Sequence, residues 1–151
     1  MRSALRSVGL ACAFLLVVGL VPTLAPAQSD KSDSQLRTIN DRVVELHRAG
    51  KFAEAIPLAK RYADGVKARH GTRHAEYATS LHNLAHLLMA TNRSSEAEPL
   101  MRQALGIYEK TLGADHPSVA VTLKSLGHLS LTTNRPQEAE RLHRRGIPRP
   151  R

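Results

Sequence analysis

The strongest constraint on the fold of this chain is a pattern that returns after 42 residues. When the sequence is aligned with itself at that offset, 12 of the 25 positions in 81–105 are identical to their counterparts, without a gap. Thr-Asn-Arg, two variable residues and Glu-Ala-Glu occur at 91–98 and again at 133–140. A fainter copy of the pattern lies upstream at the same offset. Because a fixed period of this length is typical of repeat architectures, we predict three units, which begin near residues 37, 79 and 121.

Each unit has the pattern of two helices joined by a turn. In the second unit, Leu81, Leu84 and Leu88 recur at steps of three and four residues, which places them on one face of a helix. Asn92 follows, and asparagine tolerates the left-handed conformation that ends a helix. The Glu-Ala-Glu string suits the first turn of a second helix, where negative charge is favoured. Since one hairpin cannot bury all its apolar residues, the stacking of successive hairpins closes the core.

The second and third units resemble tetratricopeptide repeats of the 42-residue kinesin-light-chain-like type, which many bacterial proteins also contain. The resemblance rests on Leu81-His82-Asn83-Leu84-Ala85, on the recurring Thr-Asn-Arg and Glu-Ala-Glu strings, and on Gly113-Ala114-Asp115-His116-Pro117. The first unit departs from the family pattern at Arg42, where an apolar residue is usual, and at Tyr62, where a small one is usual. The resemblance implies an all-α, right-handed α-solenoid of antiparallel helix hairpins. It extends over 37–146 in units 37–78, 79–120 and 121–146, the last of them truncated.

The resemblance also implies a concave groove, lined by the first helix of each unit, that binds another protein or an extended peptide. The candidate groove residues are Arg37, Asn40 and His47 in the first unit, Thr79, His82, Asn83, His86 and Met89 in the second, and Lys124, Ser125 and His128 in the third. Asn83 matches an asparagine that holds the peptide backbone in related grooves. Asp41 and Ser125 replace this asparagine in the first and third units, which argues against a regular asparagine ladder.

The candidate groove is polar with an excess of cationic residues. Arg37, Lys124 and the histidines predict a preference for an extended peptide with acidic side chains or a free carboxylate, because charge adds specificity to binding. We expect binding to weaken with salt, and to weaken above pH ~7 as the histidines lose charge. The alternative interpretation is that these residues form solvated helix faces without a ligand.

The first 27 residues have the layout of a secretory signal peptide. Arg2 and Arg6 precede an uncharged run over 8–21, and Ala25-Pro26-Ala27 places small residues where a signal peptidase cleaves. The alternative is a membrane anchor, for which the run is shorter than the ~20 residues that span a bilayer. We therefore expect cleavage after Ala27, export to the periplasm or the medium, no stable membrane insertion afterwards, and a disordered linker over 28–36.

Composition and motifs argue against catalysis and nucleic-acid binding. The net charge of +9 comes mainly from the signal region and from 141–151, and we expect a disordered basic tail over 147–151. The balanced middle of the chain and its few aromatic residues offer neither a basic face nor stacking platforms for bases. Cys12, the only cysteine, lies in the signal region, and nucleophile and phosphate-loop motifs are absent from the sequence. We predict a non-enzymatic scaffold without a cofactor or a metal.

Two alternative functions follow from other features. The two prolines after Gly146 stop the last helix early, which fits a truncated N-terminal piece of a larger exported enzyme or signalling protein. A small metal-binding protein is the second alternative, because His82 and His86 have a spacing that chelates zinc and His128 occupies the repeat-related position. His70 and His74 share this spacing near a loop.

Overall fold

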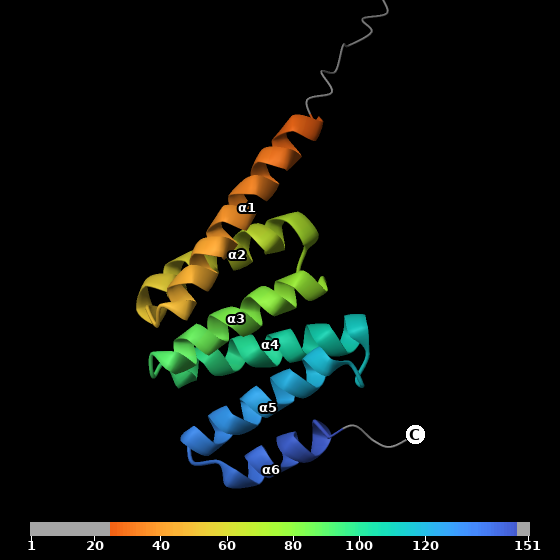
Figure 1. The fold of residues 1–151 in the computed structure, drawn as a ribbon. Helices are drawn as coiled ribbons and strands as arrows, with labels where there is room; N and C mark the ends of the chain where they lie inside the picture. Colours follow the sequence, from red (N-terminus) through yellow and green to blue (C-terminus); the bar gives the residue numbers. More distant parts are fainter. Residues whose placement is uncertain (1–24, 148–151) are drawn as a thin grey trace, which may run out of the picture.

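The computed structural model describes residues 25–147, with side chains from residue 32 onward. Within this range the chain forms six helices and no strand (Figure 1). The helices are α1 (Ala25–Arg48), α2 (Phe52–His70), α3 (Ala75–Ala90), α4 (Ser94–Leu112), α5 (Pro117–Thr132) and α6 (Pro136–Arg145). They pair into three antiparallel hairpins, one for each repeat, so the predicted all-α array of helix hairpins is confirmed.

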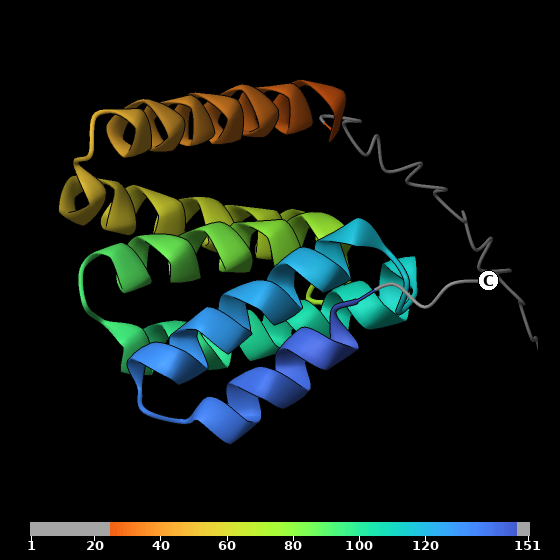
Figure 2. The same cartoon turned by 60° about the horizontal axis from the view of Figure 1, so that its bottom comes forward.

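The hairpins stack in chain order, and each helix packs mainly against the helices that precede and follow it. Figure 2, which turns the molecule by 60°, shows the same succession from α1 to α6. The buried apolar side chains form one cluster that extends from Val43 on α1 to Leu142 on α6. Each hairpin therefore buries its apolar residues against its neighbours, as expected for a repeat array.

The turn inside each hairpin contains one residue in the left-handed conformation. Gly50, Asn92 and Asn134 occupy this position at intervals of 42 residues, with φ angles of 71°, 61° and 59°. Glycine and asparagine adopt this conformation at low cost, which ends the first helix and turns the chain into the second. The prediction from Asn92 is thereby confirmed.

Small residues occupy positions where helices pack closely. Ala55, Ala97 and Ala139 recur every 42 residues and are at most 1% exposed. Gly127 lies against the ring of His143, and a Cβ atom at this position would collide with that ring. The recurrence of alanine therefore reflects tight packing rather than helix propensity alone.

Residues 28–36 are part of α1, so the prediction of a disordered linker there is wrong. Their polar composition favoured a linker, but contacts with α2 decide the structure. Asp33 forms an ion pair with Arg69. Leu36 lies against Gly65, where an added Cβ atom would force the Leu36 side chain to shift. These contacts with α2 stabilise the turns of α1 that lie before residue 37, where the array was predicted to begin.

The outer face of α1 differs from the corresponding faces of α3 and α5. Leu84 and Leu87 are buried on α3 and have leucine counterparts on α5. The equivalent residues of α1 are Arg42 and Glu45, which are exposed and form an ion pair at 2.7 Å. The departure of Arg42 from the family pattern therefore gives α1 a polar face that water can cover.

Two predictions concern the ends of the chain. The predicted signal peptide (1–27) lies outside the described residues except for its last three positions, and the predicted basic tail (147–151) does so except for Ile147. Among the described helices, none combines the length and the apolar character that a membrane span requires.

Candidate functional site

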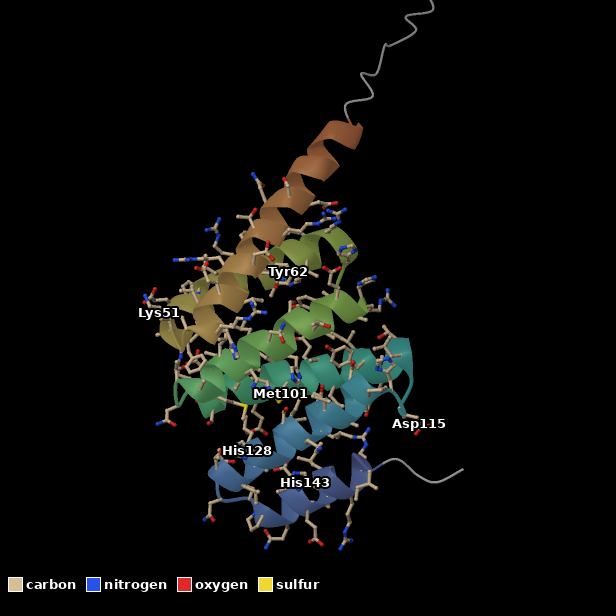
Figure 3. All side chains as sticks on the ribbon, in the orientation of Figure 1. Lys51, Tyr62, Met101, Asp115, His128 and His143 are labelled. Carbon is tan, nitrogen blue, oxygen red and sulfur yellow. The ribbon has the colours of Figure 1, made fainter. Side chains whose placement is uncertain are left out.

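Two hollows lie between the first helices of successive hairpins. The first has a volume of about 230 Å³ and lies between α1 and α3, where Asn40, His47, Asn83 and His86 surround it. The second has a volume of about 280 Å³ and is lined by His86 and Met89 from α3 and by His128 from α5 (Figure 3 labels His128). Since His86 lines both, the two hollows form one continuous surface, which we call the groove.

The structure thus brings together six of the residues predicted from the sequence. A third hollow of about 250 Å³ between α1, α2 and α3 is lined by Arg37. The other four predicted residues, Thr79, His82, Lys124 and Ser125, line none of these three hollows.

The first hollow combines an apolar floor with polar walls. Val43 and Leu87 are buried beneath it, and Val44 is 39% exposed at its edge. The amide groups of Asn40 and Asn83 can each donate and accept hydrogen bonds. This combination suits the backbone of an extended peptide above and an apolar side chain below.

Arg48 also lines the first hollow, although the sequence analysis did not select it. It directly follows His47 in the last turn of α1. Whether its side chain reaches the hollow depends on how α1 is rotated about its own axis, which the sequence does not give. Among the described residues that line the first or the second hollow, none carries a carboxylate. Arg48 therefore gives the groove a positive charge that no acidic neighbour in its lining offsets.

Thr79 and His82 connect neighbouring helices. The hydroxyl of Tyr108 donates a hydrogen bond to Thr79 Oγ1 at 2.8 Å. The hydroxyl of Thr122 donates to the carbonyl of Ser118 at 2.7 Å, which leaves its oxygen free to accept from His82 Nδ1 at 3.2 Å. These contacts join α3 to α4 and to α5.

Burial lowers the pKa of His82 to about 4, with a further contribution from His86. The pKa of His86 is lowered by burial and by the nearby His47 and His128. His86 Nε2 also lies 3.4 Å from Ser125 Oγ on α5. Both pKa changes favour the neutral imidazole, so we expect no positive charge from His82 or His86 at neutral pH.

The metal alternative based on the groove histidines gains no support from the geometry. The rings of His82 and His86 lie 5.1 Å apart between centroids. Among the described side chains, the one group of three histidine, cysteine or acidic ligand atoms within 4.8 Å of one another is His70, His74 and Glu76. This group includes neither of the two rings and does not include His128.

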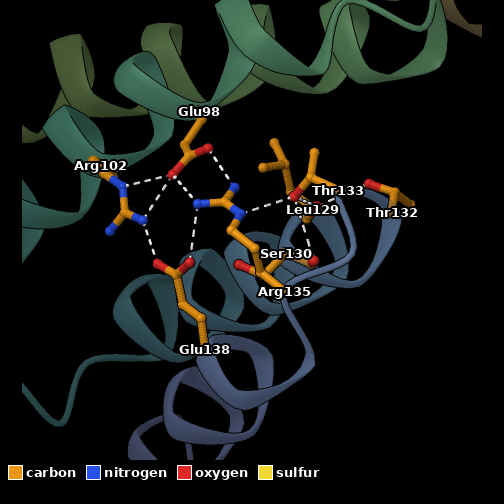
Figure 4. A network of polar contacts seen from close by, with 8 residues as sticks. All are labelled: Glu98, Arg102, Leu129, Ser130, Thr132, Thr133, Arg135 and Glu138. Carbon is orange, nitrogen blue, oxygen red and sulfur yellow. Dashed lines mark hydrogen bonds and ion pairs between the residues drawn. The ribbon is translucent and has the colours of Figure 1, made fainter.

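A network of ion pairs joins α4 to α6 on the second helices (Figure 4). Arg135 donates two hydrogen bonds to Glu98, at 3.0 and 2.5 Å, and one to Glu138 at 2.9 Å. Arg102 donates to Glu98 at 2.7 Å and also to Glu138. Such forked bonds between guanidinium and carboxylate are both directional and strong. The hydrogen bond from Arg135, followed by that from Arg102, lowers the pKa of Glu98 to about 2.

The network gives a role to Thr133, Arg135 and Glu138 of the second copy of the strings and to Glu98 of the first copy, whereas Arg93 pairs with Glu96 of its own unit. Thr133 donates to the carbonyl of Leu129 at 2.9 Å and accepts from Arg135 Nε at 3.0 Å. Arg135 is thereby held where it reaches both its own unit and the preceding one. The sequence analysis assigned the acidic residues to a helix start, and it missed their second role because the partner residues belong to different repeats.

Stacked helix hairpins at a 42-residue interval, with a groove along their first helices, define a helical-repeat array. Arrays of this class generally serve as scaffolds for protein interactions. The sequence model described as "Tetratricopeptide repeat" matches residues 78–118. Residues 78–118 therefore match a tetratricopeptide repeat, and the chain is similar to solved repeats of the kinesin-light-chain type, which confirms the resemblance noted in the sequence.

Solved structures share the fold of the chain. The chain is similar to BtubC (BKLC) from P. vanneervenii, with a TM-score of 0.70 and 19% identity over 76% of this chain and 45% of that one. It is also similar to the nearly identical TPR-like repeats of a protein from Podosopora anserina described as a kinesin light chain, with a TM-score of 0.65 and 26% identity. A variant of those repeats has a TM-score of 0.66 and 27% sequence identity to this chain. Each of the latter two comparisons covers 76% of this chain and 54% of the other.

The chain thus spans about half the length of these structures. No curated protein matches the sequence significantly.

Proposed function

We propose that the chain is a non-enzymatic scaffold that binds an extended peptide segment of another protein in the groove. The observation that carries this proposal is the first hollow, which Asn40 of α1 and Asn83 of α3 line together with the apolar Val43 and Leu87. Two amide side chains that line one hollow can bind the N–H and C=O groups of a peptide backbone. The floor formed by Val43 and Leu87 then accepts one apolar side chain of that peptide.

The charge of the groove favours an acidic peptide. Arg48 lines the first hollow. Arg37 lines the third hollow instead, together with Asp33, Asp41 and Glu76. A carboxylate on the peptide meets a guanidinium without competition from an acidic residue in the groove lining. The preference rests on arginine rather than on histidine, so it persists above pH 7 and declines with added salt.

Binding can be measured by fluorescence anisotropy with labelled, extended peptides in matched pairs, in which Asp and Glu are replaced by Asn and Gln. We expect tighter binding of the acidic member of each pair at low salt. Asn83→Ala weakens binding of every peptide about fivefold, since one hydrogen bond contributes about 1 kcal/mol. Arg48→Gln removes the preference for acidic peptides and leaves the affinity for the amide peptides unchanged.

Gln103→Ala is the matched control, because Gln103 is exposed on α4 and lines neither part of the groove. Equal affinity for acidic and amide peptides would refute the role of charge. Unchanged binding in both Asn83→Ala and Arg48→Gln would place the peptide outside the groove.

We also propose that the protein is exported. The support is the sequence of the first 27 residues, with Arg2 and Arg6 before an uncharged run and small residues at 25 and 27. Mass spectrometry of the protein expressed in a host with a secretory pathway tests this proposal. We expect a mature chain that begins at Gln28, and a product that keeps residues 1–27 would contradict it.

A further inference from the structure

We propose that His70, His74 and Glu76 form a binding site for a divalent transition metal ion of the zinc class, separate from the groove. His70 ends α2, His74 immediately precedes α3, and Glu76 lies in the first turn of α3. One ligand atom from each residue lies within 4.8 Å of the other two. His70 Nε2 is already 3.2 Å from Glu76 Oε2. Imidazole nitrogens and carboxylate oxygens are ligands that zinc prefers.

The loop between α2 and α3 brings these ligands together. Gly71 adopts a φ of 79°, which turns the chain sharply after His70. The rings of His70 and His74 stack as a result, with centroids 4.7 Å apart. The two histidines are four residues apart in the sequence, but they meet across a turn and not along one helix. Three protein ligands leave a fourth position of a tetrahedral ion open to water or to a group of another molecule.

Tyr62 contacts the carboxylate oxygen of Glu76 that does not face His70. Its hydroxyl donates a hydrogen bond to Glu76 Oε1 at 3.2 Å, while Oε2 points toward His70. A hydrogen bond of this kind orients a carboxylate ligand and raises the affinity of a metal site. Tyr62 is also one of the two residues that depart from the family pattern in the first unit. The metal site gives this departure a role.

The next loop of the array shows that the fold itself does not require this cluster. Gly113 is again left-handed, with a φ of 90°, and His116 again caps the following helix by accepting from the backbone N–H of Ser118 at 3.1 Å. The positions equivalent to Tyr62, His70 and Glu76 are Ala104, Leu112 and Ser118. The histidine cap therefore belongs to both loops, and the two further ligands and their support belong to the first loop alone.

Metal binding would displace the cap at His74. Its Nδ1 accepts a hydrogen bond from the backbone N–H of Glu76 at 3.3 Å. If Nδ1 binds the metal, its lone pair is no longer available to that N–H. If Nε2 binds the metal, Nδ1 carries the proton of the neutral ring and cannot accept. The amide of Glu76 is thus a reporter of metal binding, and the amide of Ser118 is its internal control.

Zinc chloride is the probe, titrated into the full chain without a histidine tag in competition with a chelating dye. We expect one zinc ion for each chain, and a shift of the Glu76 amide resonance without a shift of the Ser118 amide. His70→Ala and Glu76→Gln each weaken binding by more than the roughly tenfold loss expected for Tyr62→Phe, which removes support but no ligand. Glu76→Gln preserves the shape of the side chain, so it separates a lost ligand from a lost fold.

The first control is His116→Ala, which removes the equivalent cap of the next loop. The second control is His82→Ala, which removes one member of the His82–His86 pair on α3. Both are expected to leave zinc affinity unchanged. The proposal is overturned if the chain binds no zinc, if His70→Ala and Glu76→Gln bind it as the unmodified chain does, or if His82→Ala abolishes binding. Circular dichroism of each variant confirms that the helices are retained.

Discussion

Replacing Glu98 by Gln tests whether the ion pairs between α4 and α6 stabilise the stacking of the second and third units. The substitution keeps the size of the side chain and removes the charge that Arg135 and Arg102 share. A carboxyl pKa lowered from 4.5 to about 2 corresponds to roughly 3 kcal/mol. The side chain of Glu98 is 21% exposed and water screens part of this interaction. We therefore expect a loss of about 1–2 kcal/mol at pH 7.

The pH dependence of this loss follows from the sign of the pKa change. The folded state holds the proton of Glu98 less tightly than the unfolded state does. The stabilisation is therefore complete above about pH 4.5 and is lost as the pH falls toward 2. Urea unfolding of the unmodified chain and of Glu98→Gln at pH 7, 4 and 3 should show a difference that narrows with acid.

The repeat supplies a matched control for this experiment. Glu140 occupies the position equivalent to Glu98 and pairs with Arg144 along the same helix, with its side chain 63% exposed. Because this pair joins no two units, Glu140→Gln should change the free energy of unfolding little. Equal losses in Glu98→Gln and Glu140→Gln, or a loss in Glu98→Gln that is independent of pH, would refute the reasoning.

Two other substitutions test the packing of the array. Ala97→Leu should overpack a fully buried position and lower the free energy of unfolding by ~1–3 kcal/mol, and an unchanged melting temperature would contradict the assigned helix crossing. His82 has a folded pKa of about 4 against an ordinary 6.5, so the unfolded state takes up its proton first, and stability should fall by about 1–2 kcal/mol as the pH drops from 6.5 to 4. In His82→Gln, the free energy of unfolding should change less between pH 6.5 and 4. An identical pH dependence in the variant would assign the acid sensitivity to other groups.

The fold was predictable from the sequence because its determinants repeat. The apolar residues of α3 recur at helical spacing, and Asn92 and Asn134 mark equivalent turns. Ala97 and Ala139 likewise coincide at the 42-residue offset, which identified a close crossing without knowledge of its partner. Local periodicity and repetition thus specified the helices and their order.

Contacts between units were harder to predict. Residues 28–36 have a polar composition, and only the contact of Asp33 with Arg69 on α2 explains why they are helical. His82 and Asn83 are adjacent in the sequence, yet Asn83 lines the groove and His82 bonds to Thr122 on α5. Neighbouring positions on a helix point about 100° apart, so the rotation of α3 against its partners separates their roles.

Glu76 shows the same limit for the candidate metal site. The spacing of His70 and His74 was visible in the sequence, but the third ligand depends on the path of the chain through Gly71. Likewise, Glu98 and Arg135 are 37 residues apart, and only the stacking of two hairpins brings them together. Side chains that act across a repeat boundary are therefore the ones that a periodic pattern does not assign.

The polar outer face of α1 gives the array a direction in which it can be lengthened. A duplicate of residues 79–120 placed after the second unit would pack its leucines against the leucines of the neighbouring units. It would also carry its own copies of Arg93 and of Asn92, the residue that turns the chain in the left-handed conformation. The same duplicate placed ahead of α1 would cover Arg42 and Glu45 with an apolar surface, and the removal of this ion pair from water would oppose stacking. Designed extensions of this protein should therefore be inserted after the second unit and not ahead of α1.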